Sequence, residues 1–322
     1  MLLVLTIDFI VKFSSDRQIF SLEMAIVKSK DILGPMRVPF LILTPACVLL
    51  GVATALRSGV PISIIEVILV LIGAVCTHIS VNSFNEYADF KSGLDARTQR
   101  TPFSGGSGTL PAKPEMAIPA LVTALSSLGI AILVGLYFTW QHGLALLPLG
   151  VLGILVILTY TPWLTRIPLL CLVAPGMGFG PLMVMGTHFA LTGQYSWTAF
   201  LASLVPFFLV SNLLLLNQFP DVEADRTIGR RHFPILIGRR LSSYIFSAFL
   251  VLTYVVILVG VFLAILPVGS LLGLATLLLA IPLLKGSITH SDDIKNLIPF
   301  MGKNVLVNLL TPVLVAVGIF IH

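Results

Sequence analysis

Two short acidic clusters are the part of this sequence whose residue types and spacing could do chemistry. They hold six of its fourteen acidic residues, and each begins with Asn followed four positions later by Asp. The first cluster comprises Asn85, Glu86, Asp89 and Asp95, and the second comprises Asn217, Asp221, Glu223 and Asp225. On a helix, the four-residue step between Asn217, Asp221 and Asp225 would place them on one face.

Carboxylates gathered on one face repel each other unless a cation neutralises them. Mg²⁺ prefers oxygen ligands and is usually held by one or two carboxylates together with substrate phosphates. A single Asp-x-x-x-Asp would more simply form surface ion pairs with a basic loop. Because the pattern occurs twice with Asn at the same spacing, we interpret the clusters as a metal and phosphate site.

Basic residues lie close to both clusters, as a site for phosphate groups requires. Lys91, Arg97 and Arg100 follow the first cluster, and Arg166 lies between the two clusters. Each of them could bind phosphate or could simply fix membrane topology. Further basic residues, Arg226, Arg230 and Arg231, follow the second cluster, and we interpret these mainly as topology determinants.

Other polar residues give weaker signals. Tyr160 could face the same cavity or could anchor a helix at the membrane interface. The glycine-rich segment 101–108 lacks a P-loop pattern and suits either a lid or a plain linker. His78 precedes the first cluster by about two helical turns and is predicted to pack inside a helix bundle, while His232 lies in a basic loop.

The elements that must position these residues are membrane-spanning helices. Hydrophobic residues make up 57% of the 322 residues and charged residues only 10%, which excludes an ordinary soluble domain. A span needs about 20 apolar residues. Cutting the sequence at its polar clusters predicts nine such segments: 38–57, 61–84, 116–138, 142–161, 168–190, 197–216, 242–266, 269–285 and 304–321.

The charges predict how these spans are oriented. With nine spans, Arg57 alone among the 19 Lys and Arg residues falls on one side, so the positive-inside rule places the N-terminus and both clusters in the cytoplasm and the C-terminus outside. We expect residues 1–37 to form a cytosolic extension and residues 38–322 a single transmembrane domain. The basic residues lie in loops and indicate no nucleic-acid binding. The matching Asn-x-x-x-Asp motifs indicate two pseudo-repeated four-helix units plus one extra helix.

The clusters resemble the paired Asp-rich motifs of the UbiA-type intramembrane prenyltransferases over nearly the whole chain from residue 38 onward. The first motif of that family is matched by Asn85, Asp89 and Asp95, with Glu86 where much of the family has Asp. The second is matched by Asp221 and Asp225. The six-residue step from Asp89 to Asp95, the segment 100–106 and the segment 217–221 are similar to the branch that prenylates 1,4-dihydroxy-2-naphthoate for menaquinone biosynthesis.

The resemblance implies a Mg²⁺-dependent prenyltransferase that binds a polyprenyl diphosphate, an aromatic acceptor and membrane lipid. It implies two Mg²⁺ ions. The implied metal ligands are Asn85, Asp89, Asp95, Asn217, Asp221 and Asp225. The implied catalytic residues are Asp89, Asp95, Asp221, Asp225 and Tyr160, and the implied diphosphate-binding residues are Lys91, Arg97, Arg100 and Arg166.

Three alternatives remain at this point. The same metal site could serve another acceptor, such as 4-hydroxybenzoate, a porphyrin or chlorophyllide, or a glycerol phosphate ether lipid. A transporter would also carry membrane carboxylates, but nearer the midplane and not gathered at one mouth. A scaffold without activity would retain the fold, although intact paired motifs argue against it.

Overall fold

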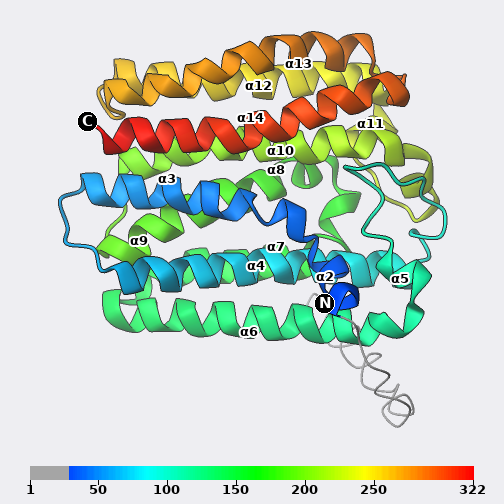
Figure 1. The fold of residues 1–322 in the computed structure, drawn as a ribbon, viewed down its shortest axis with the longest axis horizontal. Coiled ribbons are helices and arrows are strands. Elements are labelled where there is room, and N and C mark those ends of the chain that lie inside the picture. Colours follow the sequence, from blue (N-terminus) through cyan, green and yellow to red (C-terminus); the bar gives the residue numbers. More distant parts are fainter. Residues whose placement is uncertain (1–28) are drawn as a thin grey trace.

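Residues 29–322 are described by a computed structural model, and they fold into helices without a β-strand. Most of the long helices lie side by side along the long axis of the molecule (Figure 1). They are α3 (Leu43–Arg57), α4 (Ile64–Lys91), α6 (Ala117–His142), α7 (Leu147–Thr159), α8 (Pro168–Met177), α10 (Trp197–Thr227), α12 (Gly238–Phe262), α13 (Leu277–Thr289) and α14 (Ile294–Phe320). Short helical segments join them: α2 (Ser29–Met36), η2 (Val38–Phe40), α5 (Thr109–Ala112), η3 (Pro114–Met116), η4 (Leu144–Leu146), η5 (Leu164–Arg166), η6 (Gly178–Met185), α9 (Gly186–Thr192), α11 (Phe233–Leu236) and η7 (Val268–Thr276).

Eight helices within residues 29–322 are long and apolar enough to cross a membrane. The protein is therefore an all-α integral membrane protein, as predicted, but the predicted count of nine spans is not confirmed. The difference lies in segment 142–161. It forms a shorter apolar helix, Leu144–Thr159, because Gly143 at one end and a turn after Thr159 at the other limit its length.

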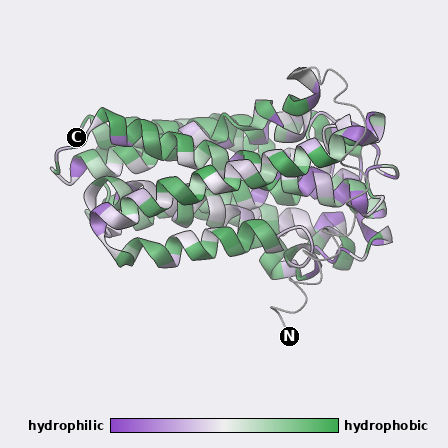
Figure 2. Cartoon of the chain, turned by 90° about the horizontal axis from the view of Figure 1, so that it is seen from below, coloured by the Kyte–Doolittle hydropathy of each residue, from purple (hydrophilic) through white to green (hydrophobic). Residues whose placement is uncertain are grey.

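The outer surface of the bundle is apolar, and its hydrophilic residues gather mainly at one end (Figure 2). Large hydrophobic side chains such as Phe262 and Leu278 are 87% and 82% exposed. Water would disfavour so much exposed hydrocarbon, whereas lipid solvates it. The packed core lies between α3, α10, α12, α13 and α14, where Leu209, Phe246 and Ile257 are fully buried.

Small residues allow two of the central helices to approach closely. A Cβ atom at Gly176 of α8 would lie 2.1 Å from the Phe207 carbonyl oxygen, and one at Gly180 would lie 2.5 Å from the Ser203 carbonyl oxygen. Only glycine fits at such a helix crossing. The helix widens into a π-helix over η6, which contains Pro181.

The helices that carry the two acidic clusters extend beyond the predicted apolar segments. Helix α4 begins at a capping box formed by Ser63 and Glu66 and continues to Lys91. Helix α10 begins after the N-cap Ser196 and continues to Thr227. Each Asn-x-x-x-Asp motif therefore lies on the last turns of a long helix, and the predicted polar stripe of the second motif is confirmed as helical.

The first 28 residues of the predicted extension lie outside the described part of the chain. Its last residues contact the bundle, where Asp31 of α2 forms a 2.7 Å ion pair with Lys113. The division into residues 1–37 and 38–322 stays a prediction, as does the internal duplication of four-helix units.

Candidate functional site

All six predicted metal ligands line one small pocket at the hydrophilic end of the bundle. The pocket has a volume of about 90 Å³. Asn85 and Asp89 come from α4, Asp95 from the loop that follows it, and the other three from the end of α10: Asn217, Asp221 and Asp225. Helices α4 and α10 are far apart in the sequence, so the bundle itself brings the two motifs together.

Arg230 connects the two motifs. Its guanidinium group pairs with Asp89 of the first motif and donates a 2.8 Å hydrogen bond to Asp225 of the second. Burial alone would lower the pKa of Arg230, but the charges of Asp89 and Asp225 raise it above its ordinary value, so the side chain stays charged. His232 lies 2.9 Å from the other oxygen of Asp225 and is only 2% exposed. The second motif is thus held in place by the segment directly after α10.

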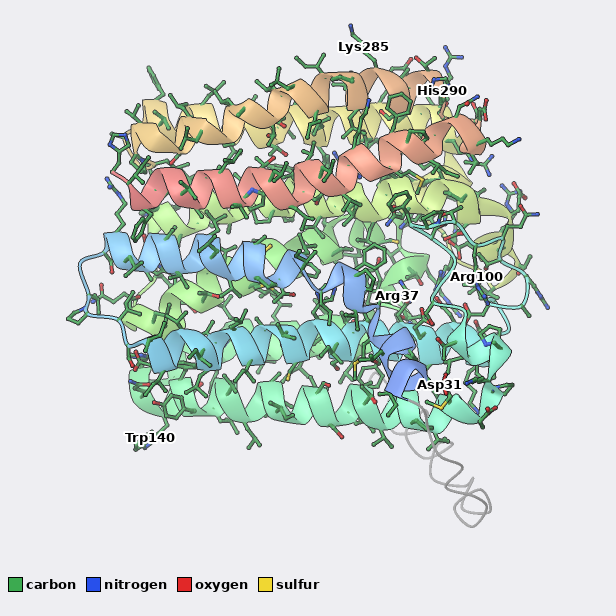
Figure 3. All side chains as sticks on the ribbon, in the orientation of Figure 1. Asp31, Arg37, Arg100, Trp140, Lys285 and His290 are labelled. Carbon is green, nitrogen blue, oxygen red and sulfur yellow. The ribbon has the colours of Figure 1, made fainter. Side chains whose placement is uncertain are left out.

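A second arginine binds the first motif. Arg37 donates hydrogen bonds to Glu86 at 2.7 Å and to Asn85 at 3.1 Å. Its backbone has a positive φ of 51°, which L-residues rarely adopt. Strained backbone of this kind is kept where the surrounding contacts require it. Figure 3 shows Arg37 on the short connection between α2 and α3, at the same end of the bundle as Arg100.

The glycine-rich loop 101–108 closes over this pocket. Ser104, Gly105 and Gly106 are part of the pocket wall. The amide and the hydroxyl of Ser107 donate hydrogen bonds of 2.8 Å and 2.7 Å to Glu86. The left-handed Gly106 packs so closely that a Cβ atom there would lie 3.2 Å from both Glu86 and Asp95.

The same loop also reaches the second motif. Ser104 and the backbone of Gly105 interact with Asp221. Phe103 packs near Gly302 of α14, where a Cβ atom would lie 3.5 Å from its ring. The loop is therefore anchored to the first motif, the second motif and α14, which favours the predicted lid over the predicted linker.

The contacts with Arg37 and Ser107 use both carboxylate oxygens of Glu86. Its side chain is fully buried, and both oxygens accept hydrogen bonds from Arg37 or Ser107. The residue that departs from the family pattern therefore holds Arg37 and the loop, and it is not part of the pocket wall.

The pocket has oxygen atoms that lack partners. Asp95 Oδ2 and Asp221 Oδ1 are buried and accept no hydrogen bond within the described residues. Burial, together with the charges of Glu86 and Asp89, raises the pKa of Asp95 to about 7. A cation in the pocket would remove this penalty. No three acidic, histidine or cysteine side chains between residues 29 and 322 converge closely enough to hold a metal by themselves. A bound ion would therefore also need amide, water or phosphate oxygens as ligands.

A second, larger cavity adjoins the pocket and lies in the apolar part of the bundle. It has a volume of about 430 Å³ and is lined by residues of α4, α6, α7, η6, α10 and α14. Four residues belong to the walls of both cavities: Asn85, Tyr160, Leu214 and Asn217. Tyr160 therefore faces the cavities, which favours the first of the two interpretations of this residue.

The four predicted diphosphate-binding residues are exposed and do not line the pocket: Lys91, Arg97, Arg100 and Arg166. The Lys91 ammonium group lies 5.7 Å from the ring centre of Tyr87, and Arg100 packs against Gly108. The cations on the pocket wall are instead Arg37 and Arg230. The predicted phosphate role of the four exposed residues stays a prediction.

Sequence reasoning overlooked three residues of this site. Arg37 precedes a span and Arg230 lies in a basic loop, so each resembled a topology determinant. His232 was not distinguished from other loop residues. For two of these residues the sequence does give a signal, because Arg230 and His232 follow Asp225 by only five and seven residues.

Comparisons with known proteins found a matching family and several relatives. The model of the UbiA prenyltransferase family matches residues 44–301. A 1,4-dihydroxy-2-naphthoate octaprenyltransferase from Bacillus subtilis is 29% identical over 65% of this chain, and the match spans 66% of that relative's length, slightly less than two thirds.

Solved structures share the fold. A UbiA homologue from Aeropyrum pernix superimposes with a TM-score of 0.66 at 20% identity, covering 88% of this chain and 98% of that one. A UbiA homologue from Archaeoglobus fulgidus, solved with DMAPP and Mg²⁺ bound, superimposes with a TM-score of 0.57 at 14% identity, covering 90% and 99%.

Proposed function

This chain belongs to the UbiA prenyltransferase family, and we propose that it transfers a polyprenyl chain from an allylic polyprenyl diphosphate to 1,4-dihydroxy-2-naphthoate. One observation carries the proposal: both acidic motifs line one polar pocket that shares part of its wall with a large apolar cavity. Such a pair of cavities suits a substrate with a charged head and a hydrocarbon tail. The naphthoate acceptor is supported by the Bacillus subtilis relative and by the six-residue step from Asp89 to Asp95.

The pocket residues fit Mg²⁺ as the cofactor. Carboxylate and amide oxygens are the ligands that this ion prefers, and Asp95 and Asp221 each have a buried oxygen without a partner. We propose that Asn85, Asp89 and Asp95 hold one ion and Asn217, Asp221 and Asp225 a second. Bound Mg²⁺ would stabilise the negative charge that develops on the departing diphosphate.

The chain's own residues would bind and orient the donor. Arg37 and Arg230 lie on the pocket wall and would face the remaining phosphate charge, with Lys91, Arg97, Arg100 and Arg166 at the entrance. Closure of loop 101–108 would exclude water, which would otherwise compete for the reactive prenyl group. Tyr160 borders both cavities and would lie beside the first carbons of the chain.

The transfer exchanges one bond for another. The allylic C–O bond breaks, and its electron pair leaves with the diphosphate. An electron pair of the acceptor ring forms the new C–C bond to the prenyl carbon that carried the diphosphate, and the ring becomes aromatic again by losing a proton or CO₂. For 1,4-dihydroxy-2-naphthoate, we propose that the carboxyl group is lost as CO₂ in the course of the reaction.

The apolar cavity would hold the isoprenoid tail, which gains by avoiding water. The pocket end of the bundle would face the cytoplasm, as the distribution of Lys and Arg predicts.

Transfer by the purified protein in detergent tests the proposal. Geranylgeranyl diphosphate would be the donor, and 1,4-dihydroxy-2-naphthoate and 4-hydroxybenzoate would be offered in parallel with Mg²⁺ or EDTA. We expect Mg²⁺-dependent product from the naphthoate alone. Product from 4-hydroxybenzoate alone would contradict the proposed acceptor. Equal amounts of product in EDTA and in Mg²⁺ would contradict the proposed metal requirement.

A further inference from the structure

One histidine in the wall of the apolar cavity has a ring nitrogen without a partner. We propose that His78 binds the aromatic acceptor through a hydrogen bond between this nitrogen and a ring hydroxyl group. The inference deepens the proposed function and rests on it, because it assigns the acceptor to a particular place in the cavity.

The ring of His78 is held in a fixed orientation. His78 lies on α4, is 5% exposed and lines the apolar cavity. Its Nδ1 atom is 2.8 Å from the hydroxyl oxygen of Thr44 on α3. Its ring meets Phe179 edge to face, with 4.7 Å between the ring centres. These two contacts leave Nε2 as the ring's only available hydrogen-bonding atom.

Nε2 is accessible from the cavity. It makes no hydrogen bond within the described residues, and it is not among the fully enclosed side-chain atoms that lack a partner. If Thr44 donates to Nδ1, then Nε2 carries the proton and is a donor; in the other tautomer it is an acceptor. A hydroxyl group can both donate and accept, so a phenolic ligand suits either tautomer.

His78 also lies at a suitable depth. It precedes Asn85 by seven residues, which places it on the same face of α4 and about 10 Å deeper in the bundle. Asn85 borders the polar pocket as well, so a ligand beside the diphosphate head can extend from there toward His78. The first prenyl carbons and a fused bicyclic ring together span a distance of this order.

The hydrocarbon tail is a poorer occupant for this position. An isoprenoid offers no hydrogen bond, and it would leave Nε2 buried without a partner, which is unfavourable. An unmet hydrogen-bonding atom that is accessible in an apolar cavity indicates a ligand that carries a polar group of its own.

The chain provides a matched control. His188 is 2% exposed, and its Nδ1 atom is 3.1 Å from the hydroxyl oxygen of Thr54. This pair repeats the His–Thr contact of His78 and Thr44, but His188 is not part of the cavity wall. A loss of function caused only by breaking a buried His–Thr bond would affect both histidines.

The test compares His78→Phe, His78→Gln and His188→Phe in detergent. For each variant, we would measure the KM for 1,4-dihydroxy-2-naphthoate, Mg²⁺-dependent binding of geranylgeranyl diphosphate, and equilibrium binding of the unreactive 1-hydroxy-2-naphthoate. We expect His78→Phe to raise the acceptor KM about tenfold and to weaken hydroxynaphthoate binding equally, since one hydrogen bond is lost. Donor binding should not change. His78→Gln should recover part of the loss, and His188→Phe should behave as the wild type.

An unchanged acceptor KM in His78→Phe would overturn the inference, as would an equal loss of donor binding or an equal effect of His188→Phe. A wild-type protein that transfers nothing to the naphthoate would refute the proposed reaction separately. In that event, binding of 1-hydroxy-2-naphthoate that depends on His78 would still support the acceptor site, and its absence would refute the site as well.

Discussion

Arg230 is the residue on which the charge balance of the site most depends. It bridges Asp89 and Asp225, and its side chain is only 13% exposed. This guanidinium group neutralises two carboxylates that are also proposed metal ligands. Removal of one partner from a buried ion pair leaves the other charges uncompensated.

We therefore expect Arg230→Gln to destabilise the protein by about 3–5 kcal/mol in EDTA. Mg²⁺ with prenyl diphosphate should restore much of this loss, because the bound cations replace the lost charge. The unfolding temperature in detergent, measured in EDTA and in Mg²⁺ with diphosphate, checks both statements. Arg226→Gln is the control, since its ion pair with Glu223 is exposed and should contribute about 0–1 kcal/mol. An Arg230→Gln variant as stable in EDTA as the wild type would contradict this role.

Glu86 has a different role from the other acids of its motif. Its oxygens bind Arg37 and Ser107, so its longer side chain holds the loop that covers the pocket. Glu86→Gln keeps the shape of the side chain but removes the ion pair and one acceptor for Ser107.

We expect hydrogen exchange in loop 101–108 to become about tenfold faster in Glu86→Gln, because a hydrogen bond to a charged group contributes about 1.5–3 kcal/mol. Hydrogen exchange followed by mass spectrometry measures the change. Glu223→Gln should leave exchange in the loop unaltered, because Glu223 is exposed and its ion pair is with Arg226. Equal protection of the loop in Glu86→Gln and wild type would show that Glu86 does not hold it.

At the scale of the elements, close contact between α8 and α10 positions the second motif. Gly176 touches the backbone of α10 at Phe207, ten residues before Asn217. A side chain there would force the two helices apart and shift the motif relative to α4.

We expect Gly176→Val to destabilise the protein by about 1–3 kcal/mol, the usual cost of overpacking. Gly178→Val is the matched control, because a Cβ atom at Gly178 meets nothing within 4 Å. Unfolding temperatures of the two variants in detergent provide the comparison. Equal stability of both variants would mean that α8 and α10 do not depend on this crossing.

The sequence predicted where the helices lie better than it predicted the residues at which they end. The apolar segments identify the spans, because hydrocarbon thickness fixes their length. They cannot show that α4 continues to Lys91 and α10 to Thr227, since those last turns are polar. For the same reason, segment 142–161 could be counted as a full span, whereas its helix is shorter.

The candidate site was predictable only where spacing carried the information. Asn85, Asp89, Asp221 and Asp225 recur in a pattern, and they meet in the pocket. Arg37 and Arg230 have no pattern of their own, and only tertiary packing brings them to the acids. Lys91, Arg97, Arg100 and Arg166 are near the motifs in sequence, yet their side chains are exposed.

At the scale of the whole molecule, the distribution of Lys and Arg predicts that the pocket faces the cytoplasm. Ser58 and Ser92 are exposed at the C-terminal ends of α3 and α4, on opposite ends of the bundle. In intact cells, a membrane-impermeant maleimide should label Ser58→Cys and should label Ser92→Cys only after the membrane is opened. The three native cysteines are buried or half-buried, which keeps background labelling low. Labelling of Ser92→Cys in intact cells would show that the orientation is opposite to the predicted one.

We propose above all that the two acidic motifs together hold the metal and the diphosphate. The most direct measurement is Mg²⁺-dependent binding of geranylgeranyl diphosphate, followed by prenyl transfer, in Asp89→Asn and Asp221→Asn. Asp292→Asn is the control, because Asp292 is an exposed acid outside the pocket. We expect each motif variant to lose Mg²⁺-dependent binding and nearly all transfer while it still inserts into the membrane, and the control to match the wild type. Wild-type binding and transfer in both motif variants would contradict the account.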